Sequence, residues 1–143
     1  MLEMSNKIDY GYDNLDEAFP PIDPGCEPTG YRVLFQLRLA KKKTRGGIIL
    51  THDVQETDQW NTQIAKVVAL GSSAFCDRNT GEPWHEGAWV KPGDFVRVPK
   101  FGGDRFTVTI GEGDDKDDVL FVIFRDADIG AIVRDPLAVK SYI

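Results

Sequence analysis

Alternating apolar and polar positions divide the chain into short strands. Residues 31–39 alternate, with Val33, Phe35 and Leu37 on one face, as in a half-buried strand. Residues 119–124 are apolar throughout, which predicts a central strand buried on both faces. Four further short runs predict strands at residues 62–70, 95–99, 105–110 and 131–133. The pattern as a whole predicts a small all-β barrel or sandwich.

Turn-forming residues separate these strands. The run Lys91-Pro92-Gly93-Asp94 has the proline and the glycine that a type II turn favours at its two central positions. Residues 72–87 are rich in small, polar and turn-forming residues and predict a protruding hairpin or loop. Asp126 is placed to cap a short helical turn ahead of the last strand.

The longest segment without a strand or helix period is residues 41–59. A basic run is followed there by Gly46 and Gly47, and then by three large aliphatic residues, Ile48, Ile49 and Leu50. Long loops without structure of their own are uncommon in compact domains and are usually functional or disordered. We therefore predict a long loop that carries a short apolar hook. The alternative is that the three aliphatic residues form a short buried strand after a turn.

The acidic charge of the chain lies at its N-terminus. Residues 1–28 hold seven acidic side chains against one lysine, a balance of −6, which equals the net charge of the whole chain. Their prolines and their charge predict an extended, solvated arm. The apolar side chains spread along the arm leave a second possibility, that it docks on a neighbouring subunit or another partner. Residues 134–143 form a short C-terminal tail.

Composition narrows the function classes. With 143 residues, 41% of them hydrophobic, the chain predicts one domain with a modest core and no membrane-spanning run. The acidic balance argues against nucleic acid as a partner. Two cysteines and two histidines without paired-ligand spacing predict no metal site, and we expect no cofactor. With no secretory signal, a reducing cytoplasm is the expected location.

The order of these pieces resembles the GroES-type co-chaperonin family over residues 29–133. Four features carry the resemblance: Gly-Gly-Ile-Ile-Leu at residues 46–50, Ala-Leu-Gly at 69–71, Val-Lys-Pro-Gly-Asp at 90–94, and Asp-Ile-Gly-Ala-Ile-Val at 128–133. The resemblance implies a partly open β-barrel that assembles into a homo-heptameric ring. It also implies that this ring is the lid of a GroEL-type chaperonin chamber in which a client protein folds, and that the protein is not an enzyme.

The resemblance also assigns residues to roles. The mobile loop would be residues 41–59, with Gly46 and Gly47 as its hinge. Its tripeptide Ile48, Ile49 and Leu50 would insert between two helices of the chaperonin apical domain. The segment at residues 72–87 would form the roof of the chamber. The subunit interface would pair the last strand with the first strand of the adjacent subunit, and its residues are Ala131, Ile132 and Val133 against Arg32, Val33, Leu34 and Phe35.

Three features depart from the family pattern: the acidic arm, a roof segment rich in Trp, Pro and His, and the extended C-terminal tail. Bacteriophage-encoded members diverge in this way and assist capsid protein folding, so a viral origin and a capsid client are additional hypotheses. Two other classes of protein share features with this sequence. A zinc-dependent dehydrogenase would need a nucleotide-binding glycine fingerprint, which Gly102-Gly103 does not provide. A structural virion protein with the same barrel would have no reason to expose an apolar tripeptide.

Overall fold

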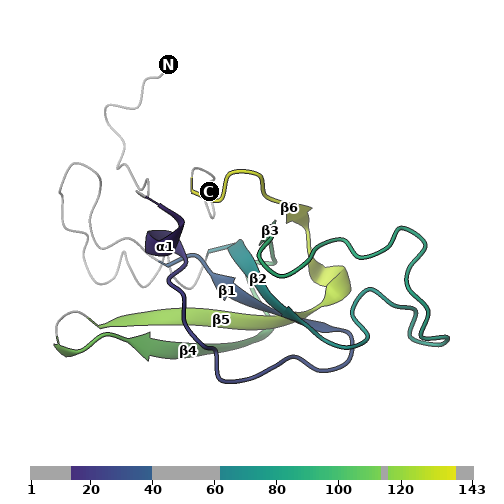
Figure 1. Cartoon of the computed structure of the whole chain (residues 1–143), viewed down its shortest axis with the longest axis horizontal. Helices are drawn as coiled ribbons and strands as arrows, with labels where there is room; N and C mark the ends of the chain where they lie inside the picture. The colour runs from purple at the N-terminus through teal and green to yellow at the C-terminus, as the bar shows by residue number, and fades with distance from the viewer. Residues whose placement is uncertain (1–13, 40–61, 114–115, 138–143) are drawn as a thin grey trace, which may run out of the picture.

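The computed structural model describes residues 14–39, 62–113 and 116–137 as one sheet with short helical segments (Figure 1). In chain order the elements are α1 (Leu15–Ala18), β1 (Arg32–Leu37), β2 (Ile64–Leu70), β3 (Phe95–Arg97), β4 (Asp104–Ile110), β5 (Asp117–Arg125), the 3₁₀ helix η2 (Asp126–Asp128) and β6 (Ala131–Ile132). Every predicted strand is present, although most are shorter at one end or both than the pattern indicated.

The six strands form one antiparallel sheet in the order β4-β5-β1-β2-β3-β6. The sheet curves around a core, but β4 and β6 are its two ends and are not paired with each other, so the barrel is open. The all-β prediction and the partly open barrel are confirmed. Among the described residues, no helix is long and apolar enough to cross a membrane.

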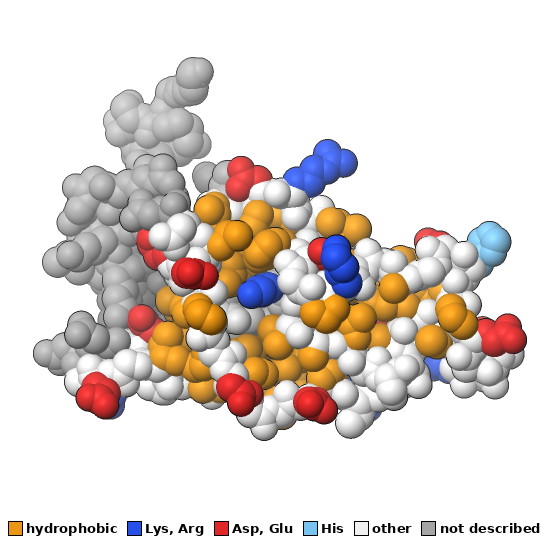
Figure 2. All heavy atoms as spheres, viewed as in Figure 1, with side chains coloured by type: hydrophobic (Ala, Val, Ile, Leu, Met, Phe, Trp, Pro, Cys, Tyr) orange, Lys and Arg blue, Asp and Glu red, His pale blue; other side chains and the backbone are white. Residues whose placement is uncertain are grey.

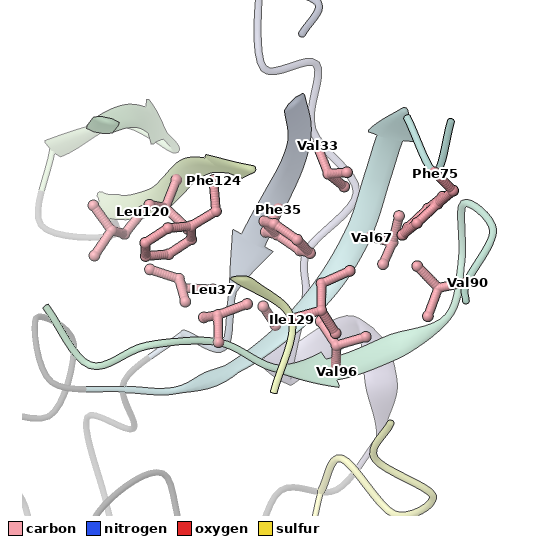
Figure 3. Packing of buried hydrophobic residues seen from close by; sticks show 13 residues of the cluster. Val33, Phe35, Leu37, Val67, Phe75, Val90, Val96, Leu120, Phe124 and Ile129 are labelled. Atoms are coloured by element: carbon pink, nitrogen blue, oxygen red, sulfur yellow. The ribbon is translucent and has the colours of Figure 1, made fainter. Parts of the chain in front are cut away.

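The main core fills the concave side of the sheet (Figure 3). Phe35 of β1 lies at its centre, between Phe124 of β5 and Val67 of β2. A second apolar cluster covers the other face of the sheet, where Leu34 of β1 packs with Val119 and Phe121 of β5. The prediction that the apolar run of β5 is buried on both faces is therefore confirmed, because its successive side chains enter the two clusters in turn.

The prediction of a half-buried β1 is wrong. Residues 33–37 of this strand are all buried, and Gln36 is only 3% exposed. The cause is the N-terminal arm, which runs across the second face: the Gln36 amide donates a hydrogen bond of 2.8 Å to the Pro20 carbonyl, and Ile22 packs against the cluster around Leu34. A polar residue at an alternating position is here buried and hydrogen-bonded by a segment distant in sequence.

The described part of the arm, residues 14–28, is only partly the solvated tail that its composition predicts, because a short stretch of it is buried against the sheet. Asn14 caps α1 by accepting a hydrogen bond of 2.9 Å from the Glu17 amide. A helix of four residues is not stable alone, so its packing must hold it. Ala18 and Phe19 provide that packing: they are 0% and 2% exposed and form an apolar cluster with Ile64 of β2 in the same chain.

The loop that joins β3 to β4 is held by the side chain of Arg105. The Arg105 guanidinium binds three of its carbonyl groups, those of Pro99, Lys100 and Gly102, at 3.0 to 3.2 Å. Burial of this side chain lowers the pKa of Arg105. Gly103 has φ +74°, and a Cβ there would lie 2.7 Å from Val122, so the close approach of loop and sheet requires glycine.

The predicted turn at residues 91–94 is present and is held by its own carboxylate. Gly93 has φ +98°, as the second central position of a type II turn requires. The Asp94 carboxylate accepts hydrogen bonds from the Lys91 amide at 3.0 Å and the Lys91 ammonium at 3.1 Å. These hydrogen bonds lower the pKa of Asp94 below its ordinary 3.8, and the bond from the Lys91 backbone amide has the largest effect.

We expect the stabilising effect of this carboxylate to disappear in acid. Because the folded-state pKa of Asp94 lies below its unfolded value, the contribution is present above about pH 4 and is lost as pH falls through the folded-state pKa. Asp94→Asn should therefore lower the melting temperature at pH 7 and make little difference at about pH 2.5. Asp104→Asn, an exposed aspartate of β4, is the control. A deficit of equal size at both pH values would contradict this account.

Candidate functional site

The apolar hook predicted at Ile48, Ile49 and Leu50, with the hinge glycines Gly46 and Gly47, lies outside the described residues. The described chain breaks off at Leu39 and resumes at Thr62, and these two points lie on neighbouring strands. The last register pair of β1 and β2 is Leu37 with Ala65, and beyond it the Arg38 amide donates to the Ile64 carbonyl at 2.9 Å. We call residues 38–39 and 62–63 the loop base.

Hydrogen bonds to β3 and Val98 hold the β2 side of the loop base. The Val98 amide donates a hydrogen bond to the backbone carbonyl of Gln63, and the side-chain amide of Gln63 donates one to the Val98 carbonyl. The Arg97 guanidinium donates a further hydrogen bond of 3.1 Å to the side-chain oxygen of Gln63. Thr62 is 1% exposed. Both ends of the 40–61 segment thus start from fixed points on the sheet.

The second candidate surface is the edge formed by β6. Ala131 and Ile132 pair with Arg97 and Val96 of β3, and no described strand lies along the other side of β6. The Ile132 side chain beside this edge is 61% exposed. An unpaired strand edge offers a row of backbone donors and acceptors to another chain.

The other half of the predicted interface is not available for strand pairing. Arg32, Val33, Leu34 and Phe35 belong to β1, which pairs with β5 along one edge and with β2 along the other. Val33, Leu34 and Phe35 are each 0% exposed. A strand with neighbours on both edges has no free hydrogen-bonding row, so these residues cannot receive the last strand of another subunit. This assignment is corrected.

The predicted roof segment projects beyond the sheet, at the right of Figure 1. It is not a regular hairpin: its one described bridge pairs Cys76 with Pro83, and its tip is organised by the Asp77 carboxylate, which accepts from the Asn79 and Thr80 amides. Those hydrogen bonds lower the pKa of Asp77. At the root of the segment three aromatic rings pack with centroids 5.0 to 6.0 Å apart, those of Phe75, Trp84 and Trp89.

Asp126 fixes this aromatic root to the sheet. The sequence suggested that it caps a helical turn, whereas the structure places it inside η2, 2% exposed, with Arg125 at the capping position. Its carboxylate accepts from the Phe75 amide at 2.8 Å and from the Ala127 amide at 2.7 Å. Phe75 has φ +61°, a strained value for a residue with a bulky side chain, so an anchor at its amide is needed.

We expect Asp126→Ala to destabilise the fold by about 1–3 kcal/mol, because it leaves the buried Phe75 amide without an acceptor. The free energy of unfolding in denaturant measures the loss, and the fluorescence of the nearby tryptophans should change with it. Asp128→Ala is the matched control, since this carboxylate of the same 3₁₀ helix bonds the backbone and side chain of the exposed Arg125 and not the Phe75 amide. Equal losses in the two variants would show that Asp126 does not anchor the roof.

Potential metal ligands do not cluster among the described residues. Among the residues that the structure describes, no group of three His, Cys, Asp or Glu side chains could hold a metal ion. An open hollow of about 510 Å³ beside the β3–β4 loop is lined by Arg32, Phe101, Phe124 and Arg125 among others, and its lining contains no serine, cysteine or histidine. On the face seen in Figure 2, basic side chains are scattered singly and form no continuous patch.

The described residues form an open antiparallel barrel with a projecting segment at residues 72–87 and a free strand edge at β6. Residues 26–133 match the chaperonin 10 kDa subunit family, and the chain belongs to this family. The GroES-type resemblance is thereby confirmed.

Three relatives illustrate the similarity. The co-chaperonin GroES of Listeria monocytogenes serotype 4b is 34% identical over 108 residues, which cover 76% of this chain and 98% of the relative. The co-chaperonin GroES of Lactococcus lactis is 32% identical over 112 residues, with coverage of 76% and 98%. The mitochondrial 10 kDa heat shock protein of Saccharomyces cerevisiae is 37% identical over 106 residues, with coverage of 73% and 85%.

Proposed function

We propose that this protein is a co-chaperonin that assembles into a homo-heptameric ring and caps the chamber of a GroEL-type chaperonin, where a client protein folds. The observation that carries the proposal is the family match, which spans all six strands and the whole of the predicted loop and roof. The curated relatives named above are co-chaperonins or a 10 kDa heat shock protein. The proposal also places the protein in the cytoplasm and includes a bacteriophage origin with a capsid protein as the client.

Chaperonin contact is assigned to Ile48, Ile49 and Leu50, with Gly46 and Gly47 as the hinge. What supports it is the loop base, since Arg38 and Ile64 hold the two ends of the 40–61 segment together at one end of the sheet. A segment that leaves and returns at one point can present a short motif away from the barrel without disturbing the core.

Ring contact is assigned to the β6 edge, that is Ala131, Ile132 and Val133. Two observations support this assignment: the exposed Ile132 side chain, and the absence of a described strand along the outer edge of β6, the edge away from β3. The receiving surface of the adjacent subunit lies outside β1, for the reason given above. The roof role of residues 72–87 is supported by their projection from the sheet and by their aromatic root.

Retention on an immobilised GroEL-type chaperonin, with and without nucleotide, tests the proposal together with the native mass of the free protein. We expect a ring several times the 16.0 kDa chain mass and a nucleotide-dependent complex with the chaperonin. A ring that never binds the chaperonin would indicate a structural protein that keeps the barrel alone. If the free protein is a monomer at working concentration, the proposal that it forms a lid is wrong, because the lid requires a ring.

A further inference from the structure

Two segments that lie outside the family match converge on a single spot of the barrel. The match spans residues 26–133, so it includes neither α1 and Phe19 nor the start of the C-terminal tail. Nevertheless, Ala18 and Phe19 form a buried cluster with Ile64 of β2, and Leu137 of the tail packs against the same cluster. Phe95 of β3 and Val133 complete it.

On one side this cluster holds the loop base. The Leu39 amide, the last described group before the 40–61 segment, donates to the Ala18 carbonyl at 2.8 Å. The neighbouring Arg38 is 6% exposed, and its guanidinium donates to the Pro136 carbonyl at 3.0 Å. A buried charged donor bonded to a tail carbonyl fixes the tail to the loop base, because an unsatisfied guanidinium there would carry a large desolvation cost.

On its other side the cluster supports the β6 edge. The Phe19 and Phe95 rings lie 5.1 Å apart, and the Phe95 carbonyl accepts a hydrogen bond of 2.8 Å from the Val133 amide, directly after β6. Val133 is itself half-buried against the cluster. Removing the Phe19 ring would therefore leave a cavity that borders both the loop base and the β6 edge.

We propose that α1 and Phe19, together with Pro136 and Leu137, form a brace that mechanically couples the loop base to the β6 edge. This inference rests on the proposed function, since it connects the segment assigned to the chaperonin with the edge assigned to the ring. The brace fixes Leu39, which shortens the length of chain that must be ordered when the hook docks, and such pre-organisation strengthens binding. It also keeps β6 paired with β3 while the hook is bound to the chaperonin.

Amide hydrogen exchange on the free, full-length protein tests the brace. Phe19→Ala should raise exchange at the Leu39 and Val133 amides together, by about tenfold or more, because both lose the packing that closes them. The Gly71 amide, bonded to the Arg32 carbonyl at the opposite end of β1 and β2, reports on the rest of the sheet and should change by less than about threefold. Ile22→Ala is the matched control, because it truncates an aliphatic residue of the same arm that packs against a separate cluster, the one around Leu34.

The outcomes separate clearly. Faster exchange confined to Leu39 and Val133 supports the brace, whereas a uniform increase that includes Gly71, or the same pattern in Ile22→Ala, overturns it. If Phe19→Ala does not fold, Phe19→Leu and Leu137→Ala provide milder truncations of the same cluster and should show the same two amides exchanging faster. No chaperonin enters the measurement, so a failed brace is distinguishable from a failed co-chaperonin assignment.

Discussion

Replacing Ile49 with aspartate is expected to abolish chaperonin-dependent refolding while leaving the ring intact. Ile49 is the middle residue of the proposed hook, and its burial should contribute about 1.5–3 kcal/mol per loop. The substitution removes that contribution and places an unpaired carboxylate in an apolar groove, which adds a further penalty. Because every subunit carries the same change, the loss applies at each docking site of the ring.

Weak individual docking explains why the loss should be complete. Three buried aliphatic side chains stabilise a docked loop by about 4.5–9 kcal/mol. Ordering about six loop residues at roughly 1–2 kcal/mol each removes most or all of that gain. A single loop should then bind no more tightly than about millimolar, and useful affinity arises because the remaining loops of the ring dock at high effective concentration.

Refolding of a chaperonin-dependent client, and retention of the variant on the chaperonin, measure the effect. Gln55→Asp is the control, since it adds the same charge to a polar position of the same segment and should cap the chaperonin nearly as well as the parent protein. Native mass should be unchanged in both variants. If Ile49→Asp still caps the chaperonin normally, the hook has been assigned to the wrong residues.

Where the sequence pattern predicted the fold correctly, the physical cause was local. The unbroken apolar run of β5 required burial on both faces, and the proline and glycine of the 91–94 turn required their observed conformation. Strand ends were predicted less well. The pattern extended β1 to residue 39, but the Leu39 amide bonds the Ala18 carbonyl of the arm and the Arg38 side chain bonds the Pro136 carbonyl of the tail.

The features missed from the sequence depend on contacts between distant residues. Phe19 stands beside two prolines in an acidic arm, so nothing local distinguishes it from a solvated aromatic residue, and only its contact with Phe95 shows its role. The Phe75 amide and the Asp126 carboxylate are likewise 51 residues apart. The β1 interface assignment failed for a related reason, since which strands border β1 is a property of the sheet and not of its own residues.

Replacing Ile132 with proline is expected to convert the ring to monomers of 16.0 kDa without unfolding the subunit. Val133 donates to the Phe95 carbonyl, so the alternation of an antiparallel pair turns the neighbouring Ile132 N–H away from β3, toward the free edge. Proline removes that outward donor and disfavours pairing with another chain, while a strand edge tolerates its fixed φ. Native mass measured across concentrations detects the change.

Ile132→Ala separates backbone from side chain in this experiment. It removes most of a side chain that is 61% exposed but keeps the N–H, so it should weaken the ring less than proline does if strand pairing holds the subunits together. Were alanine to dissociate the ring as fully as proline, the edge would act through its apolar side chain instead. A ring that survives both substitutions would remove β6 from the interface. Since the brace seats this same edge, the Phe19→Ala variant should then keep its ring as well.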